Sequence, residues 1–145
     1  MAYTRFEYSE FDGLTIFKNA RLRSTVRKKL GGDYKTFPKT QVSENSTDVF
    51  GGAAVKVWYE ADDEVKGVQL YHPEAEFYYF GKQLLGNNVE ELELFFVAIG
   101  QPLIADDDGT GFSTINETIR FYVPDFDEFQ KKACVECVYV DIPKT

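Results

Sequence analysis

The chain has little of what most catalytic and metal sites are made from. Its 145 residues include one histidine, two cysteines and one tryptophan. Two cysteines are too few for the disulfide framework of a small secreted protein, and with one histidine they do not supply four soft zinc ligands. A nucleophilic triad of the usual kind would depend on His72 alone. Because the nucleophile elbow, phosphate loop and dinucleotide fingerprint are also missing, we expect a protein that is not an enzyme.

Long apolar runs and a secretory signal are missing as well. No run reaches the roughly 18 apolar residues of a transmembrane helix. The N-terminal residues, Met-Ala-Tyr-Thr-Arg-Phe-Glu-Tyr, lack a basic segment followed by an apolar core. We therefore expect a cytoplasmic protein with no membrane partner.

Positive charge is scarce. Sixteen Lys and Arg residues stand against 24 Asp and Glu residues, so the formal net charge is −8. Nucleic-acid binding relies on cations that neutralise phosphates, so we expect no nucleic-acid partner. A basic protein partner is compatible with this charge.

Apolar and aromatic residues are plentiful. The hydrophobic fraction of 43% and the charged fraction of 28% are typical of globular proteins. We expect residues 1–145 to form a single domain that buries a core without a structural metal or cofactor. Aromatic residues make up 16% of the chain, which suits half-buried sheets.

The clearest pattern lies in residues 55–71, where two runs of β-branched and aromatic residues flank an acidic turn. This pattern predicts a β-hairpin. Alternation places Val55, Val57 and Tyr59 on one face of the first strand. The other face then carries Lys56, Trp58 and Glu60.

Two segments have helical spacing. In residues 20–30, Asn19 is the expected N-cap, Leu22, Val26 and Leu30 share one face, and Gly31 ends the helix. The opposite face carries cations that we interpret as a solvated helix face, namely Arg21, Arg23, Arg27, Lys28 and Lys29. The second helix is predicted over residues 89–99, after Asn87 or Asn88.

A further pair of strands is predicted around residues 118–123 and 135–140. With the central hairpin, it indicates an α+β fold in which two helices pack on one face of a mostly antiparallel sheet. The order of elements suggests a degenerate tandem with halves 1–71 and 72–145, in which Trp58-Tyr59 corresponds to Phe121-Tyr122. Chance similarity between amphipathic segments is the alternative.

Two short motifs are close to known metal or redox patterns. Residues 106–117 match a calcium loop with Asp106, Asp108, Gly111 and Glu117 at positions 1, 3, 6 and 12. Position 5 is Thr110 and a strand, not a helix, is predicted to follow, so an acidic turn is the favoured interpretation and calcium stays open.

The second motif is the CxxC formed by Cys134 and Cys137. It lies in strand-like sequence, where a spacing of three puts the side chains on opposite faces. We interpret the pair as two buried or half-buried cysteines that form neither a zinc site nor a redox site.

Several scaffold segments carry a family resemblance. They are Leu22, Val26 and Leu30-Gly31, then Phe37–Thr40, Asn45–Phe50, Val55–Tyr59 and Val65–Leu70, and finally Gly111–Ser113, Ile119–Asp125 and Cys137–Val140. In these segments the chain resembles small bacterial immunity proteins of toxin–immunity systems, and also orphan proteins of mobile gene cassettes. The resemblance implies a function by binding and carries no active site.

An immunity protein occludes its toxin, and toxin domains that attack nucleic acid are commonly basic. Complementary charge would then favour binding through exposed acidic turns. The candidate partner-binding residues are Glu60, Asp62, Asp63, Glu64, Asp106, Asp107 and Asp108.

Three alternatives remain open. A small-ligand module of a mobile gene cassette would use an aromatic-lined cavity between helices and sheet, built from Phe77, Tyr78, Tyr79, Phe80, Phe95, Phe96, Phe121 and Tyr122. A homodimer through a sheet edge is an alternative to a monomer. The many carboxylates leave a paired-carboxylate hydrolase open, although nothing selects a pair.

Overall fold

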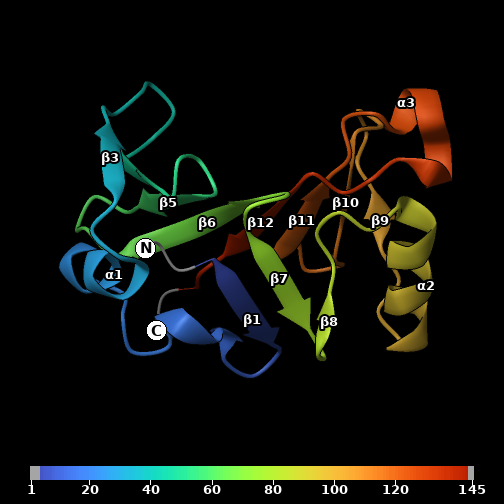
Figure 1. Ribbon diagram of the computed structural model, residues 1–145, viewed down its shortest axis with the longest axis horizontal. Coiled ribbons are helices and arrows are strands. Elements are labelled where there is room, and N and C mark those ends of the chain that lie inside the picture. The colour runs from blue at the N-terminus through green and yellow to red at the C-terminus, as the bar shows by residue number, and fades with distance from the viewer. Residues whose placement is uncertain (1–3, 144–145) are drawn as a thin grey trace.

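The computed structural model describes residues 4–143 and is shown in Figure 1. The elements of the first half are β1 (Arg5–Ser9), β2 (Gly13–Leu14), a 3₁₀ turn (Thr15–Phe17), α1 (Arg23–Leu30), β3 (Tyr34–Phe37), β4 (Thr47–Phe50), β5 (Val55–Tyr59) and β6 (Val65–Tyr71). Those of the second half are β7 (Glu76–Tyr79), β8 (Lys82–Gln83), α2 (Val89–Ala98), β9 (Ile104–Ala105), β10 (Gly111–Ser113), β11 (Ile119–Tyr122), α3 (Phe126–Phe129), a 3₁₀ turn (Gln130–Lys132) and β12 (Cys137–Asp141).

The strands form two sheets. The large one has eight strands in the order β3-β4-β5-β6-β12-β11-β10-β9, and every neighbouring pair is antiparallel. The small one has the order β2-β1-β7-β8, in which β1 and β7 run parallel. The predicted α+β class with mostly antiparallel strands is therefore confirmed.

One face of the large sheet is covered. In Figure 1, α1 and α2 lie at opposite ends of the molecule with β1, β7 and β8 between them. The ring of Phe121 on β11 contacts Phe96 of α2 and Phe77 of β7, with centroids 5.6 and 6.2 Å apart. At the other end, the guanidinium of Arg23 on α1 lies 4.2 Å from the ring centroid of Tyr59 on β5. One core cluster of buried residues includes side chains from both sheets and from α1 and α2.

The helices differ from the prediction in number and in one boundary. Residues 4–143 contain three α-helices, not two, because α3 forms within the charged connection between β11 and β12. A four-residue helix is too short to show a helical period in the sequence. The first helix begins at Arg23 and not near Asn19, because Leu22 is held extended by a bridge to Glu64. The second begins as predicted, where the Asn88 side chain accepts a 2.9 Å hydrogen bond from the Glu91 N–H.

The order of elements is similar in the two halves of the chain, apart from α3 and the 3₁₀ turns. Each half has a short two-stranded pair, one longer helix and four strands of the large sheet, and the two halves meet where β6 pairs with β12. The predicted correspondence of Trp58-Tyr59 with Phe121-Tyr122 is out of register by one residue. Trp58 faces away from the core, whereas Phe121 is 1% exposed and points into it. A shift of one residue exchanges the two faces of a strand.

Candidate functional site

Alternation along the central strands places a set of aromatic side chains on the face of the large sheet that points away from the core, here called the outer face. Val55, Val57 and Tyr59 are buried as predicted, so Trp58 points outward. By cross-strand pairing, the outer face also carries Tyr71 on β6, Tyr139 on β12 and Tyr122 on β11.

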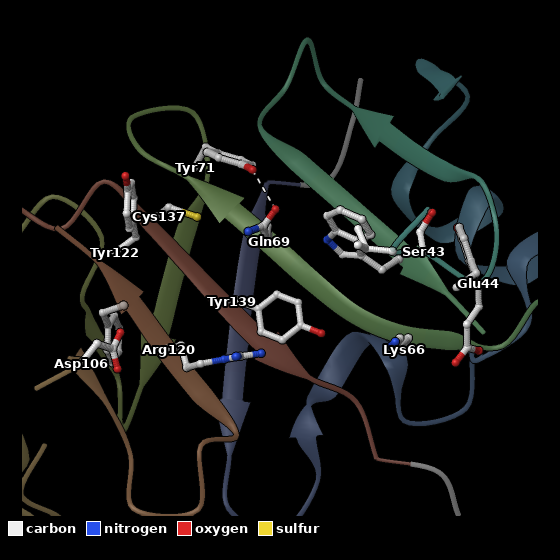
Figure 2. A pocket seen from close by; sticks show the side chains of 14 residues that line it. Ser43, Glu44, Lys66, Gln69, Tyr71, Asp106, Arg120, Tyr122, Cys137 and Tyr139 are labelled. Atoms are coloured by element: carbon white, nitrogen blue, oxygen red, sulfur yellow. Dashed lines mark hydrogen bonds between the residues drawn. The ribbon is translucent and has the colours of Figure 1, made fainter. Parts of the chain in front are cut away.

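These four aromatic residues line an open groove of about 830 Å³, here called the outer-face groove. Figure 2 looks onto it, with Tyr139 and Gln69 near the middle and with Asp106 and Glu44 at opposite ends. The remaining lining residues are Val42, Ser43, Tyr59, Lys66, Arg120, Phe121 and Cys137. The groove thus combines a broad aromatic surface with a small number of polar groups.

The floor of the groove is set by Tyr139 and Gly67. A Cβ built on Gly67 would overlap the hydroxyl and ring of Tyr139, so only glycine leaves the ring where it lies. The Tyr139 hydroxyl donates a 3.0 Å hydrogen bond to Asp141, and the Arg120 guanidinium lies 4.6 Å from the ring centroid. These contacts hold Tyr139 between strands β6 and β11.

Trp58 lines the groove from strand β5. The Lys56 ammonium is 4.3 Å from its ring centroid. The indole Nε1 is buried and has no hydrogen-bond partner in residues 4–143. An unpaired buried donor costs free energy.

Burial raises the pKa of several side chains of the groove. It raises the pKa of the Cys137 thiol to about 12. Burial and the neighbouring Cys137 raise the pKa of Tyr71 to about 12. Burial and Asp141 also raise the pKa of Tyr139 above its ordinary value. The charges in the groove are therefore those of Lys66, Arg120, Asp106 and Glu44.

The core side of the sheet contains an ion-pair network centred on Asp48. This carboxylate is fully buried and accepts hydrogen bonds from Arg23, Arg27, Thr36 and Tyr59 at 2.8–3.4 Å. Burial alone would raise the pKa of Asp48, but these donors lower it to about 2. The network joins α1 to β3, β4 and β5, so its role is structural.

The network corrects the interpretation of the basic helix face as solvated. The side chains of Arg21 and Arg23 are only 15% and 11% exposed, and both form ion pairs. Arg27 also pairs with Asp48, whereas Lys28 and Lys29 are exposed as expected. Spacing along the helix did not reveal the carboxylate that meets these arginines, because it lies on a strand about 20 residues away.

The first predicted acidic turn, residues 60–64, mostly contacts other parts of the same chain. Asp63 accepts hydrogen bonds from Arg23 at 3.2 Å and from Asn45 at 2.6 Å. Glu64 pairs with Arg21 at 3.4 Å. The side chain of Asp62 accepts from the Glu64 N–H, and the carbonyl of Glu60 accepts from Asn45. These contacts fix the turn against α1.

The second predicted acidic turn lies at the end of the outer-face groove. Asp106 lines the groove and accepts a 3.4 Å hydrogen bond from Ser113. Asp107 and Asp108 are exposed, and hydrogen bonds from Thr110 lower the pKa of Asp108. Strand β10 separates these residues from Glu117, so residues 106–117 do not form one continuous calcium loop. In residues 4–143 no group of three His, Cys, Asp or Glu side chains is placed to hold a metal ion.

The aromatic residues predicted to line an internal cavity contact one another instead. Tyr79, Phe95, Phe96, Phe77 and Phe121 form a chain of ring contacts with centroids 5.3–6.2 Å apart. Of the eight residues predicted for that cavity, Tyr122 and Phe121 line the outer-face groove. The groove is therefore on the opposite side of the sheet from the cavity that the sequence suggested.

The other residues singled out in the sequence are the two cysteines and His72. Cys137 is buried as predicted, but the predicted burial of Cys134 is wrong, because its side chain is exposed just before strand β12. The two are not joined by a disulfide. His72 packs against Gly86, where a Cβ would stand 2.5 Å from the imidazole Cε1. Neither arrangement brings a base beside a nucleophile.

No protein family, curated protein or solved structure matches this chain. The function is therefore argued from the site itself. None of the helices formed by residues 4–143 is long and apolar enough to cross a membrane.

Most residues of the groove were missed from the sequence. Lys66, Tyr71, Arg120 and Tyr139 were not candidates, because their strands are scattered along the chain and only the sheet order brings them together. The signal that could have found them is the outward register of each predicted strand, which Trp58 already showed.

Proposed function

We propose that this protein is a cytoplasmic, non-catalytic binding protein whose outer-face groove binds a protein partner. It would act as an immunity protein does when it occludes a toxin domain. The observation that carries the proposal is the gathering of Trp58, Tyr71, Tyr122, Tyr139 and Arg120 on an open sheet face. Trp, Tyr and Arg are the residues in which binding hot spots are richest. Rigid aromatic side chains supply contact area at little entropic cost.

The predicted acidic residues take different parts in this proposal. Asp106, Asp107 and Asp108 stand at one end of the groove and would contact the rim of a partner. Asp63 and Glu64 are already paired with arginines of the same chain, so their exchange for an external cation would gain less. We therefore assign the 106–108 turn to the interface and the 60–64 turn to its support.

The test uses the gene that lies beside this one in its source. Its product is expressed in bacterial cells with and without this protein, and the two purified proteins are mixed in a calorimeter. We expect growth arrest that this protein relieves, and a stoichiometric complex. Neither rescue nor a complex would remove the immunity form of the proposal.

A pair of variants ties the complex to the groove. Tyr122 is 49% exposed in the groove, and Phe129 is 53% exposed on α3, outside the groove lining. We expect Tyr122→Ala to weaken the complex about ten-fold or more, because central aromatic anchors cost over 1 kcal/mol when truncated. Phe129→Ala is the matched control and should bind as the wild type does.

A small-ligand module is the second candidate, favoured by the size of the groove. Its volume of about 830 Å³ falls within the range of drug-sized binding sites. A thermal-shift screen with aromatic carboxylates separates the two candidates. Stabilisation that rises with ligand concentration and is lost in Tyr122→Ala supports the module.

The repeated order of elements supports the proposal of a degenerate tandem. In both halves a cation and an aromatic residue stand two positions apart on the outer face, Lys56 with Trp58 on β5 and Arg120 with Tyr122 on β11. A duplicated ancestor would thus have contributed one cation–aromatic pair from each half to the groove.

A further inference from the structure

We infer that the outer-face groove receives an extended acidic segment of the protein partner, whose carboxylates meet Lys66 and Arg120. This inference rests on the proposed function and names the chemistry of the partner. It reverses the expectation of a basic partner, which came from the net charge of the whole chain. The strands of the outer face carry mostly cations among their charged side chains.

The charged side chains that point outward from the strands of the large sheet are mostly cations. They include Lys35 on β3, Lys56 on β5, Lys66 on β6 and Arg120 on β11, against Asp141 on β12. Among these strand side chains, four cations and one anion give +3, in a chain whose net charge is −8. Glu44, Asp106 and Glu74 line the borders of the face, so the positions of the cations, and not its net charge, favour an acidic segment. Asp141 is occupied by the Tyr139 hydroxyl.

The four cations are available to a partner. In the part of the chain that the structure describes, the ion pairs within 4.0 Å involve Lys18, Arg21, Arg23, Arg27 and Lys131, and none of the outward cations. The Lys56 and Arg120 head groups lie over aromatic rings and not beside carboxylates. An incoming carboxylate would therefore form new pairs without breaking old ones.

Cross-strand pairing arranges polar groups in a row. Lys56 stands beside Gln69, Gln69 beside Tyr139, and Tyr139 beside Arg120, on four adjacent strands. Ser113 on β10 continues the row next to Arg120. Strands are spaced about 4.8 Å apart, so the row is roughly 19 Å long, the length of about six residues of extended chain. A peptide lying across the strands could contact the whole row.

A second row provides room for apolar side chains. Tyr71, Cys137 and Tyr122 are neighbours across β6, β12 and β11. Beyond Tyr71 the outer face has another hollow of about 520 Å³, lined by Phe37, Val49 and Lys56 among others. Because Tyr71 borders both hollows, an acidic segment with interspersed aromatic or aliphatic residues would fill them together.

Single-stranded nucleic acid fits the face less well. Base stacking needs free ring faces, but the rings of Trp58 and Tyr139 each have a cation over one face. The net charge of −8 would also repel a polyphosphate chain at long range. In Figure 2, Arg120 lies toward Asp106 and Lys66 lies toward Glu44, so the two cations stand on either side of the middle of the groove and the two carboxylates at its ends.

The test uses three synthetic octapeptides with blocked ends, in which Tyr alternates with Glu, Ser or Lys. Binding is followed through the fluorescence of Trp58, the one tryptophan of the chain, excited where tyrosine does not absorb. The groove variant is Lys66→Gln with Arg120→Gln. The control is Lys28→Gln with Lys29→Gln, which removes the same charge from the exposed face of α1.

We expect the Glu-Tyr peptide to bind most tightly, and more weakly as salt is added. The groove variant should lose about ten-fold or more in affinity, since charge-assisted hydrogen bonds are lost, while the control keeps the wild-type affinity. Equal losses in the two variants would overturn the assignment to Lys66 and Arg120.

The other outcomes separate the inference from the proposed function. If the Lys-Tyr or Ser-Tyr peptide binds at least as tightly as the Glu-Tyr peptide, the inference of an acidic partner segment is wrong. The proposal that this face binds a peptide would then remain. If no peptide changes the Trp58 signal or gives heat in a calorimeter, both the inference and the groove as a protein-binding site fail. Tighter binding of an oligothymidylate than of the Glu-Tyr peptide would also overturn both.

Discussion

The ring of Tyr139 fills the space that a side chain on Gly67 would need. The two residues lie on β12 and β6, the central strands at which the two halves of the chain meet. Gly67 has no unusual backbone angle, so its small size and not its flexibility is what the site requires. This contact sets the floor of the outer-face groove.

Gly67→Ala should therefore displace Tyr139 and destabilise the fold by about 1–3 kcal/mol, the usual cost of overpacking. Chemical denaturation measures the change. Gly32→Ala is the matched control, because a Cβ there meets nothing within 4 Å. In the Tyr139→Ala background the added methyl group should cost much less, and an unchanged cost would contradict the steric account.

Asp48→Asn should be among the most damaging single changes. The variant leaves two arginines without the carboxylate that they share, and such a loss costs about 3 kcal/mol. Tyr59→Phe removes one donor to the same carboxylate and should cost about 1 kcal/mol. Urea unfolding of both variants measures the two losses in the free energy of unfolding. Equal losses would show that the arginines find other partners in Asp48→Asn.

The same carboxylate predicts an acid-sensitive stability. Burial opposes ionisation, but hydrogen bonds from Arg27 and Arg23 prevail and hold the pKa of Asp48 at about 2, below the ordinary 3.8. A carboxyl group with a depressed pKa stabilises the fold fully above the ordinary value and loses this contribution as the pH falls. We expect about 2 kcal/mol to disappear between about pH 4 and pH 2. The free-energy difference between wild type and Asp48→Asn should shrink over this window.

Most of the fold followed from local patterns. Strand β5 of the central hairpin alternates strictly, and α2 has both a cap and an apolar stripe, so their positions were predicted closely. The short elements were not predicted. The four residues of α3 and the parallel pairing of β1 with β7 depend on contacts between distant segments, which no local period encodes.

The site was harder to predict than the fold, for a physical reason. Exposed acidic turns stand out in a sequence, but whether their carboxylates are free depends on which cations fold against them. Asp63 and Glu64 meet Arg23 and Arg21, about 40 residues earlier. Conversely, the outward Arg120 and Lys66 reach one groove only through the sheet order. Net charge therefore did not reveal these outward cations.

The two cysteines should differ sharply in reactivity. Burial raises the pKa of Cys137 to about 12, so its thiol stays protonated and shielded, whereas Cys134 is exposed. A disulfide reagent at about pH 8 should modify one thiol per folded chain and two after unfolding. Cys134→Ser should abolish the fast reaction. Fast modification of both thiols in the folded protein would show that the groove floor opens.

Asp63 and Asp107 provide a direct test of which acidic turn is structural. Both are acidic residues of exposed turns, but the carboxylate of Asp63 accepts from Arg23 and Asn45 while Asp107 is fully at the surface. Asp63→Asn keeps a residue that tolerates the positive φ of 66° at this position, so its effect reports the lost charge and not backbone strain. We expect a loss of about 1 kcal/mol for Asp63→Asn and a change within about 0.5 kcal/mol for Asp107→Asn. Equal stabilities in urea unfolding would show that the contacts of the 60–64 turn with α1 contribute nothing measurable. The turn would then again be a candidate for partner binding.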